Sequence, residues 1–262
     1  PKNLAYMTNK ISQYTRNRYK IEATSSSSAG AGSVITVNLP SGGGIIDLAS
    51  FKWVINKASA VNSGTSPSGD TYYAKLPNNI QSLISRVDVF CNGVAINQAF
   101  SEYNSGFQML KLIRGTQDRD QSFDKCVQNS AMDDDLASDT NKRFVMCDWL
   151  GLIGGETSTR FLDSSLVGQI QIRITLSGNE VLVPAHNNNG NLSFTTRGPG
   201  DTPTPVDNGT VLGASLSYSL QDFYFTIDTV SLDPMYQMML REQIARNGML
   251  EVNFLAYYSF LK

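Results

Sequence analysis

Side chains that could do acid–base or metal chemistry are scarce in this chain of 262 residues. Its single histidine, His186, lies in the Asn- and Gly-rich stretch PAHNNNG. Without a second histidine, a histidine-based zinc site or a serine–histidine pair has little to work with. We therefore interpret His186 as a solvated side chain in a loop.

Aspartates are concentrated in one stretch, MDDDLASD, which contains Asp133, Asp134, Asp135 and Asp139. Carboxylates at this density suit Ca²⁺, which prefers oxygen ligands. The stretch lacks the glycine and the terminal glutamate of an EF-hand loop. We favour a solvated acidic loop, and cation binding by Asp133–Asp139 stays an open alternative.

Four other acidic residues are candidates for the paired carboxylates of a glycoside hydrolase: Glu22, Asp47, Asp88 and Glu156. Nothing in the sequence brings any two of them together. The glycine-rich stretches at 29–32 and 41–44 lack the G-K-[ST] ending of a P-loop and the G-x-G-x-x-G spacing of a dinucleotide site. We predict that the protein is not an enzyme and has no cofactor, metal site or small-molecule substrate.

The composition favours a protein that packs against copies of itself. Charged residues make up 17% of the chain, below the usual share of about a quarter, and neutral polar residues and glycine replace them. Such surfaces are common in self-packing β proteins and in secreted adhesins. The net charge of −2 gives no overall attraction to nucleic acid, and no apolar run approaches the ~18 residues of a membrane helix.

The cysteines argue against a disulfide framework. There are three, Cys91, Cys126 and Cys147, and none is in a C-x-x-C spacing. An odd number without metal-ligand spacing predicts reduced thiols, and therefore assembly inside a cell. The chain also shows no signal-peptide pattern.

The first 21 residues carry five basic side chains and no acidic one: Lys2, Lys10, Arg16, Arg18 and Lys20. Such an arm can lie along nucleic acid or an anionic surface such as an internal membrane, or it can pack on neighbouring subunits. Five charges are few for a genome-binding arm, so we favour contact with neighbours. Together with the flexible loop SSSSAGAG (25–32), the arm makes up an N-terminal segment of residues 1–32.

Residues 33–262 are predicted to form one mostly β domain. In QIQIRITLSG (169–178), apolar residues alternate with polar ones, as in a half-buried strand. The other expected strands are 33–40, 45–56, 82–98 (a hairpin that turns at Asn92-Gly93), 142–154, 215–232 and 249–261. Helices are expected at 101–115 and 234–247, and polar loops at 57–79, 116–142 and 185–210.

These elements define a fold class. Strands outnumber helices and do not alternate with them, so the sheets are antiparallel. Strands with one apolar face imply two sheets packed face to face. We predict an all-β fold, an antiparallel jelly-roll β-sandwich with long loops and two short helices. The expected core includes Phe51, Trp53 and Ile55, and also Met235, Met238 and Met239 of the second helix, packed under the sandwich.

Four stretches together resemble a known family. IIDLASFKWVIN (45–56) resembles an early strand, and LISRVDVFCNGVAINQAFSEYNSGFQML (83–110) resembles the strand, turn and short helix that follow. RFLDSSLVGQIQIRITLSGNEVL (160–182) resembles a later strand, and the segment from LQDFYFTIDTV to YYSF (220–260) resembles a closing strand–helix–strand unit. The family comprises major capsid proteins of tailless icosahedral DNA viruses, the double jelly-roll lineage of adenovirus hexon and the algal-virus and virophage capsid proteins.

The resemblance implies trimeric, pseudo-hexagonal capsomers that tile a shell, without catalysis. One feature departs from the family. A double jelly roll needs about sixteen strands, and this sequence predicts roughly ten. The chain is therefore either a single, heavily decorated jelly roll, such as a penton subunit of the same viruses, or one half of a double jelly roll.

The resulting hypothesis is a structural viral capsid protein, located in the virion and assembled inside the host cell. Its partners would be copies of itself, as homotrimers or larger arrays, and other capsid proteins. The basic arm would tether neighbours, with weak contact to the genome or an internal membrane as the alternative. A carbohydrate-binding or adhesin β-sandwich is the alternative function, with Tyr72 and Tyr73 as a sugar platform. A hydrolase on a sandwich scaffold is the third.

Overall fold

The computed structural model describes residues 14–41, 44–63, 71–77, 79–97, 102–114, 138, 140–154, 161–188, 191–194 and 216–247. Several predictions from the sequence lie outside these residues. They are the closing strand at 249–261, the four clustered aspartates, and Lys2, Lys10, Cys126 and Glu156 of the candidate residues.

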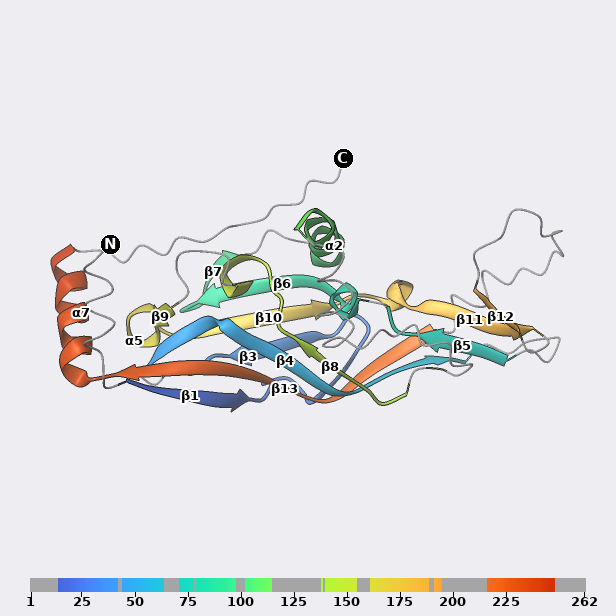
Figure 1. Cartoon of the computed structure of the whole chain (residues 1–262), viewed down its shortest axis with the longest axis horizontal. Coiled ribbons are helices and arrows are strands. Elements are labelled where there is room, and N and C mark those ends of the chain that lie inside the picture. Colours follow the sequence, from blue (N-terminus) through green and yellow to red (C-terminus); the bar gives the residue numbers. More distant parts are fainter. Residues whose placement is uncertain are drawn as a thin grey trace.

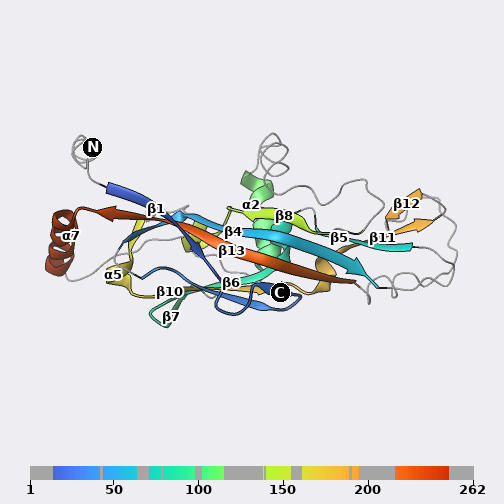
Figure 2. The same cartoon turned by 90° about the horizontal axis from the view of Figure 1, so that it is seen from below.

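The described residues form two antiparallel sheets packed into a sandwich (Figures 1 and 2). The larger sheet has the order β1 (Tyr14–Ile21), β13 (Leu216–Leu232), β4 (Ile45–Asn62) and β8 (Lys142–Met146). Two short strands extend it, β2 (Ser28–Gly30) beside β13 and β9 (Phe161–Asp163) beside β4. The smaller sheet has the order β3 (Val34–Asn38), β10 (Ile170–Leu176), β6 (Ile84–Cys91) and β7 (Val94–Asn97).

The chain passes back and forth between the two sheets. It starts in the larger sheet with β1 and β2, crosses to β3, returns to β4, and crosses again to the β6–β7 hairpin. It then returns to β8 and β9, crosses to β10, and finishes in the larger sheet with β13. This wrapping of antiparallel strands around a shared core is a jelly roll, so the predicted fold class is confirmed.

The core lies between the sheets because the strands alternate as the sequence predicts. Phe51 and Trp53 of β4 are fully buried and stack on Phe225 of β13, with ring centroids 5.5 and 5.6 Å apart. Ile172 and Ile174 of β10 are buried from the opposite sheet. Each side chain of this size stabilises the fold by about 1.5–3 kcal/mol when fully buried.

The predicted hairpin and first helix are confirmed. Asn92 and Gly93 have φ angles of 51° and 83°, as a type I′ turn between β6 and β7 requires. Helix α2 (Tyr103–Arg114) packs on β6 and on the 3₁₀-helix η1 (Ile80–Leu83). The backbone N–H of Leu150 donates a hydrogen bond to the buried Tyr103 hydroxyl (3.1 Å), which ties α2 to the segment after β8.

A third sheet corrects two of the predicted loops. It has the order β12 (Asn191–Phe194), β11 (Val183–Asn188) and β5 (Thr71–Lys75), and it extends past one end of the sandwich (Figure 1). Residues 57–79 therefore include the end of β4 as well as β5, and residues 185–210 begin with a hairpin. These segments resemble loops in sequence because their strands are only four to six residues long and lie among Gly-, Asn- and Ser-rich stretches. His186 lies in β11 rather than in a loop, opposite Tyr72 and Ser193.

The second predicted helix is confirmed, but its packing is not. Helix α7 (Pro234–Asn247) is capped by Asp233, whose carboxylate accepts a hydrogen bond from the Met235 backbone N–H (2.8 Å). It lies at the end of the sandwich, opposite the third sheet (Figures 1 and 2). Met235, Met238 and Met239 are 73, 74 and 60% exposed, so the expectation that they fill the core is wrong.

The remaining described helices are short: η3 (Gly151–Gly154), α5 (Ser164–Val167) and η4 (Asn179–Val181). Among the helices that the structure describes, none has the length and apolar character needed to cross a bilayer.

Ile172→Asp should abolish folding, because it places a carboxylate between Val37 and Val89, its neighbours on the two flanking strands. Ile172→Val, which removes one methylene, should keep the fold at a cost of ~0.5–1.5 kcal/mol. Circular dichroism and urea unfolding measure both effects. Arg173→Gln, on the exposed face of the same strand, is the matched control. An Ile172→Asp protein that unfolds like wild type would contradict the strand assignment.

Candidate functional site

Three of the five basic residues of the predicted arm lie on β1, at the edge of the larger sheet. β1 pairs antiparallel with β13 through eight residue pairs, from Tyr14–Leu232 to Ile21–Phe225. Residues 14–21 are therefore part of the sheet, although their sequence predicts an arm. Their sequence, YTRNRYKI, lacks an apolar alternation, so contacts other than burial must hold this strand.

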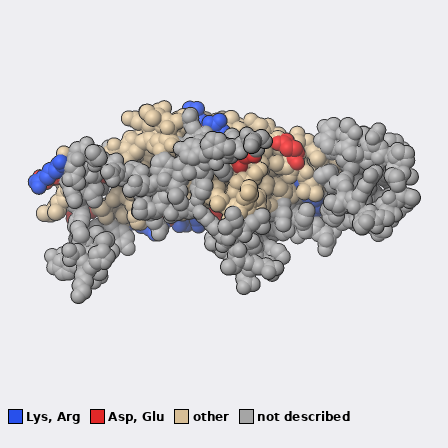
Figure 3. Space-filling view, turned by 90° about the horizontal axis from the view of Figure 1, so that it is seen from above, with Lys and Arg blue, Asp and Glu red and all other residues tan. Residues whose placement is uncertain are grey.

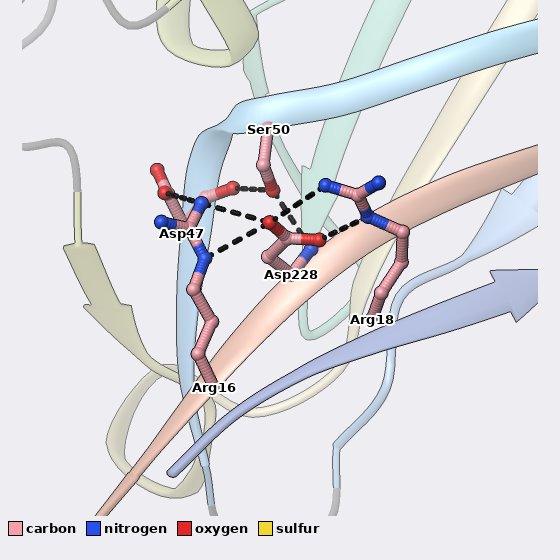
Figure 4. A network of polar contacts seen from close by, with 5 residues as sticks. All are labelled: Arg16, Arg18, Asp47, Ser50 and Asp228. Atoms are coloured by element: carbon pink, nitrogen blue, oxygen red, sulfur yellow. Dashed lines mark hydrogen bonds and ion pairs between the residues drawn. The ribbon is translucent and has the colours of Figure 1, made fainter. Parts of the chain in front are cut away.

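Arg16 and Arg18 make those contacts with Asp47 of β4 and Asp228 of β13 (Figure 4). Arg16 donates from Nε to Asp228 Oδ2 (2.9 Å) and from Nη2 to Asp47 Oδ2 (3.0 Å). Arg18 donates from Nε to Asp228 Oδ1 (2.7 Å). The Asp47 and Asp228 side chains are 0 and 5% exposed, whereas those of Arg16 and Arg18 are 48 and 65% exposed. We call these four residues the Arg–Asp cluster.

Charge pairing with the two arginines favours the ionised form of Asp228. The hydrogen bond from Arg18 is the largest cause that holds the pKa of Asp228 below its usual value, and Arg16 adds to it. Partial burial opposes this effect but does not overcome it. The same contact with Asp228 raises the pKa of Arg18. Asp228 is therefore a carboxylate that accepts hydrogen bonds at neutral pH, and it is not a proton donor.

An irregular stretch of the β4–β13 pairing brings the two aspartates together. Thr226 pairs with Lys52 and Asp228 with Asp47, so Ile227 lies opposite the four residues 48–51 of β4. Asp47 and Asp228 are thus direct partners across the two strands, and their like charges would repel each other without the arginines.

Ser50 replaces the backbone hydrogen bonds that are lost at this irregularity (Figure 4). Its hydroxyl accepts a hydrogen bond from the Asp228 backbone N–H (2.7 Å) and donates one to the Asp47 carbonyl oxygen (2.6 Å). Both backbone groups lie beside the buried carboxylates of their own residues. The geometry of the Arg–Asp cluster is therefore fixed by the strands themselves.

The cluster was only partly visible in the sequence. Asp47 was one of four candidate catalytic carboxylates, but the structure pairs it with Asp228 and not with Glu22 or Asp88, and Glu156 lies outside the described residues. Asp88 pairs with Arg86 (2.8 Å) and Glu22 with Lys20 (3.5 Å). One sequence signal could have identified the cluster: an aspartate lies among apolar residues in both IIDLASF and FTIDTV. A carboxylate buried in such a strand requires a cationic partner.

The other candidate residues lie apart from the cluster. Lys20 is exposed, and its ammonium lies over the Tyr224 ring at 4.8 Å. Burial raises the pKa of the Cys91 thiol, whose Sγ donates a hydrogen bond to the Val167 carbonyl oxygen (3.0 Å). Within the described part of the chain, no group of three His, Cys, Asp or Glu side chains has the arrangement of a metal site. What the cluster can do is attach a polar strand to the sandwich.

Arg16→Gln should destabilise the protein by about 2 kcal/mol, because it leaves the fully buried Asp47 without this counterion. The loss should be smaller than the ~3–5 kcal/mol of a fully buried pair, since Arg16 is half exposed. Urea unfolding at neutral pH gives the value. Lys20→Gln removes a charge from the same strand, but its partner Glu22 is exposed, so it should cost less than ~0.5 kcal/mol. Equal effects of the two substitutions would contradict a specific role for Arg16.

The lowered pKa of Asp228 predicts the direction of a pH effect. The stabilisation from its ionised form is complete above the pKa of an unfolded aspartate, near pH ~4, and is lost as the pH falls through the lower folded value. Wild type should therefore lose more stability than Asp228→Asn between pH ~5 and ~2, as measured by urea unfolding. Asp222→Asn, which changes an exposed aspartate, should retain the wild-type profile. Parallel profiles for wild type and Asp228→Asn would refute this role.

No model of a known protein family matches the chain. No curated protein matches it in sequence.

Solved structures of viral capsids do match the fold. A quasi-atomic model of the PBCV-1 virus capsid aligns with a TM-score of 0.50 and 12% identity, over 87% of this chain and 44% of that chain. PBCV-1 VP54, whose crystal structure was fitted into a cryo-EM reconstruction of the virophage Sputnik, aligns with a TM-score of 0.51 and 13% identity over the same shares. The chain thus spans less than half the length of these neighbours. At this identity, the likeness shows that the chain has the jelly-roll fold of these capsid structures.

Proposed function

We propose that the protein is a structural capsid protein of a large icosahedral DNA virus. The observation that carries this proposal is the match of 87% of the chain to two structures described as a virus capsid and a protein fitted into a virophage reconstruction. The protein would be located in the virion, and its jelly rolls would assemble into capsomers and a shell inside the host cell. The described residues complete one jelly roll, so the chain would act as one jelly-roll unit of such a capsomer.

The side chains of the described residues favour a structural role over catalysis. The carboxylates that the sequence offered as catalytic candidates and that the structure describes are each paired with arginine or lysine. The Asp47 side chain is also fully buried, so a substrate has no access to it in this arrangement. Pairing of this kind stabilises strands and does not prepare a proton donor or a nucleophile.

Exposed apolar side chains support association with other subunits. Six of the exposed apolar residues belong to elements near the α7 end of the sandwich, namely α7, α5, β9 and β7 (Figure 1). They include Met235, Met238 and Met239 of α7, Phe161 of β9, Leu166 of α5 and Val94 of β7. The described surface also carries few charges on the face shown in Figure 3. Apolar patches of this kind mark surfaces that other proteins cover. We infer that the partners are copies of this chain, as trimers or larger arrays, and other capsid proteins.

The first experiment is the native mass of the purified protein by light scattering, followed by negative-stain images of the same peak. Trimers, or shells of repeating units, are the expected result. Ile172→Asp is the negative control, because it should lose the sandwich and with it any ordered assembly. A folded monomer of 28.7 kDa that never associates would contradict the capsid proposal. Glycan binding by that monomer would then support the adhesin alternative.

A further inference from the structure

β1 is attached to the larger sheet with hardly any apolar burial. The side chains of residues 15–20 are all exposed, and only Ile21, at the end of the strand, packs partly against the core. The strand is held by its backbone pairing with β13 and by the Arg–Asp cluster. Detaching β1 would therefore leave the apolar core almost intact.

The position beside β13 is nevertheless costly to leave empty. Without β1, Asp47 and Asp228 would lose the guanidinium groups that neutralise two facing carboxylates. The backbone groups on that edge of β13 would also lose their partners between residues 225 and 232. The edge of β13 therefore favours pairing with a strand whose arginines occupy the same positions as Arg16 and Arg18.

The connection to the rest of the chain permits such a strand to come from elsewhere. Arg16 and Asp228 are 212 residues apart in sequence, so the contact does not depend on local chain geometry. Residues 22–27 link β1 to β2 and are mostly exposed. The Thr24 backbone N–H donates to the Thr36 carbonyl (2.9 Å), which fixes the chain from that point onward. A change of direction at Glu22 and Ala23 would redirect β1 alone.

We propose that β1 is exchanged between copies: β1 of one subunit pairs with β13 of a neighbouring subunit and supplies Arg16 and Arg18 to that neighbour's Asp47 and Asp228. The occupant is a second copy of this chain, because the same strand then makes the same contacts at little net cost. Close packing of subunits raises the local concentration of neighbouring strands and favours the exchange. The proposal rests on the self-assembly proposed above, and it names the strand that joins the copies.

A disulfide between directly opposed residues tests this exchange. Thr15 and Ser231 are partners in the β1–β13 register, and both side chains are exposed. Chains that carry only Thr15→Cys are co-assembled with chains that carry only Ser231→Cys and are then oxidised. In such mixtures a disulfide between positions 15 and 231 can form only between two chains. Mass spectrometry of the linked peptides distinguishes it from disulfides of the native cysteines.

The expected result is an interchain 15–231 disulfide in the mixed particles. Copies with Ser217→Cys are the matched control, because position 217 is exposed on β13 but lies beyond the residues that pair with β1. They should not link to Thr15→Cys, and a comparable yield there would overturn the pairing. Particles that form without the 15–231 link would overturn the exchange and leave the capsid proposal standing. Chains that stay monomeric in light scattering would overturn both.

Discussion

The pairing of β4 with β13 is the interaction on which the rest of the structure depends. These two long strands supply the aromatic side chains at the centre of the core, where Phe51 and Trp53 meet Phe225. Their outer edges position the remaining strands of the larger sheet, because β1 and β2 add to β13 while β8 and β9 add to β4. The smaller sheet then covers the apolar face that this pair presents.

The same pairing contains a place where burial and charge oppose each other. Asp47 and Asp228 face each other in the two strands that supply much of the core, and Ser50 bridges the irregular pairing beside them. Two arginines from β1 neutralise the carboxylates from the edge. A strand with no apolar face is thus held in a sheet by ion pairs, and the requirement is mutual, because the aspartates need β1 as much as β1 needs them.

Much of the sandwich could be predicted from the sequence, because burial on one face leaves a period-two pattern. β10, the β6–β7 hairpin, the apolar face of β4 and the two main helices were all predicted, whereas β1, β5 and the β11–β12 hairpin were not. The side chains of residues 15–20 in β1 are exposed on both faces, and β5, β11 and β12 are only four to six residues long, so a period-two pattern is absent or too short to recognise. The Arg–Asp cluster was missed for a related reason. Arg16 and Asp228 come from opposite ends of the chain, and single-sequence patterns report only on neighbours.

The sequence separation between β1 and β13 also determines when the two strands can pair during synthesis. β1 is the first described strand to be synthesised, and its partner follows about 200 residues later. At a synthesis rate of roughly 5–20 residues per second, β13 of the same chain is made on the order of 10–40 s after β1. Its attachment is also among the most non-local contacts in the fold, a class that forms slowly. β1 therefore leaves the ribosome well before its partner strand, while other chains from the same message fold nearby.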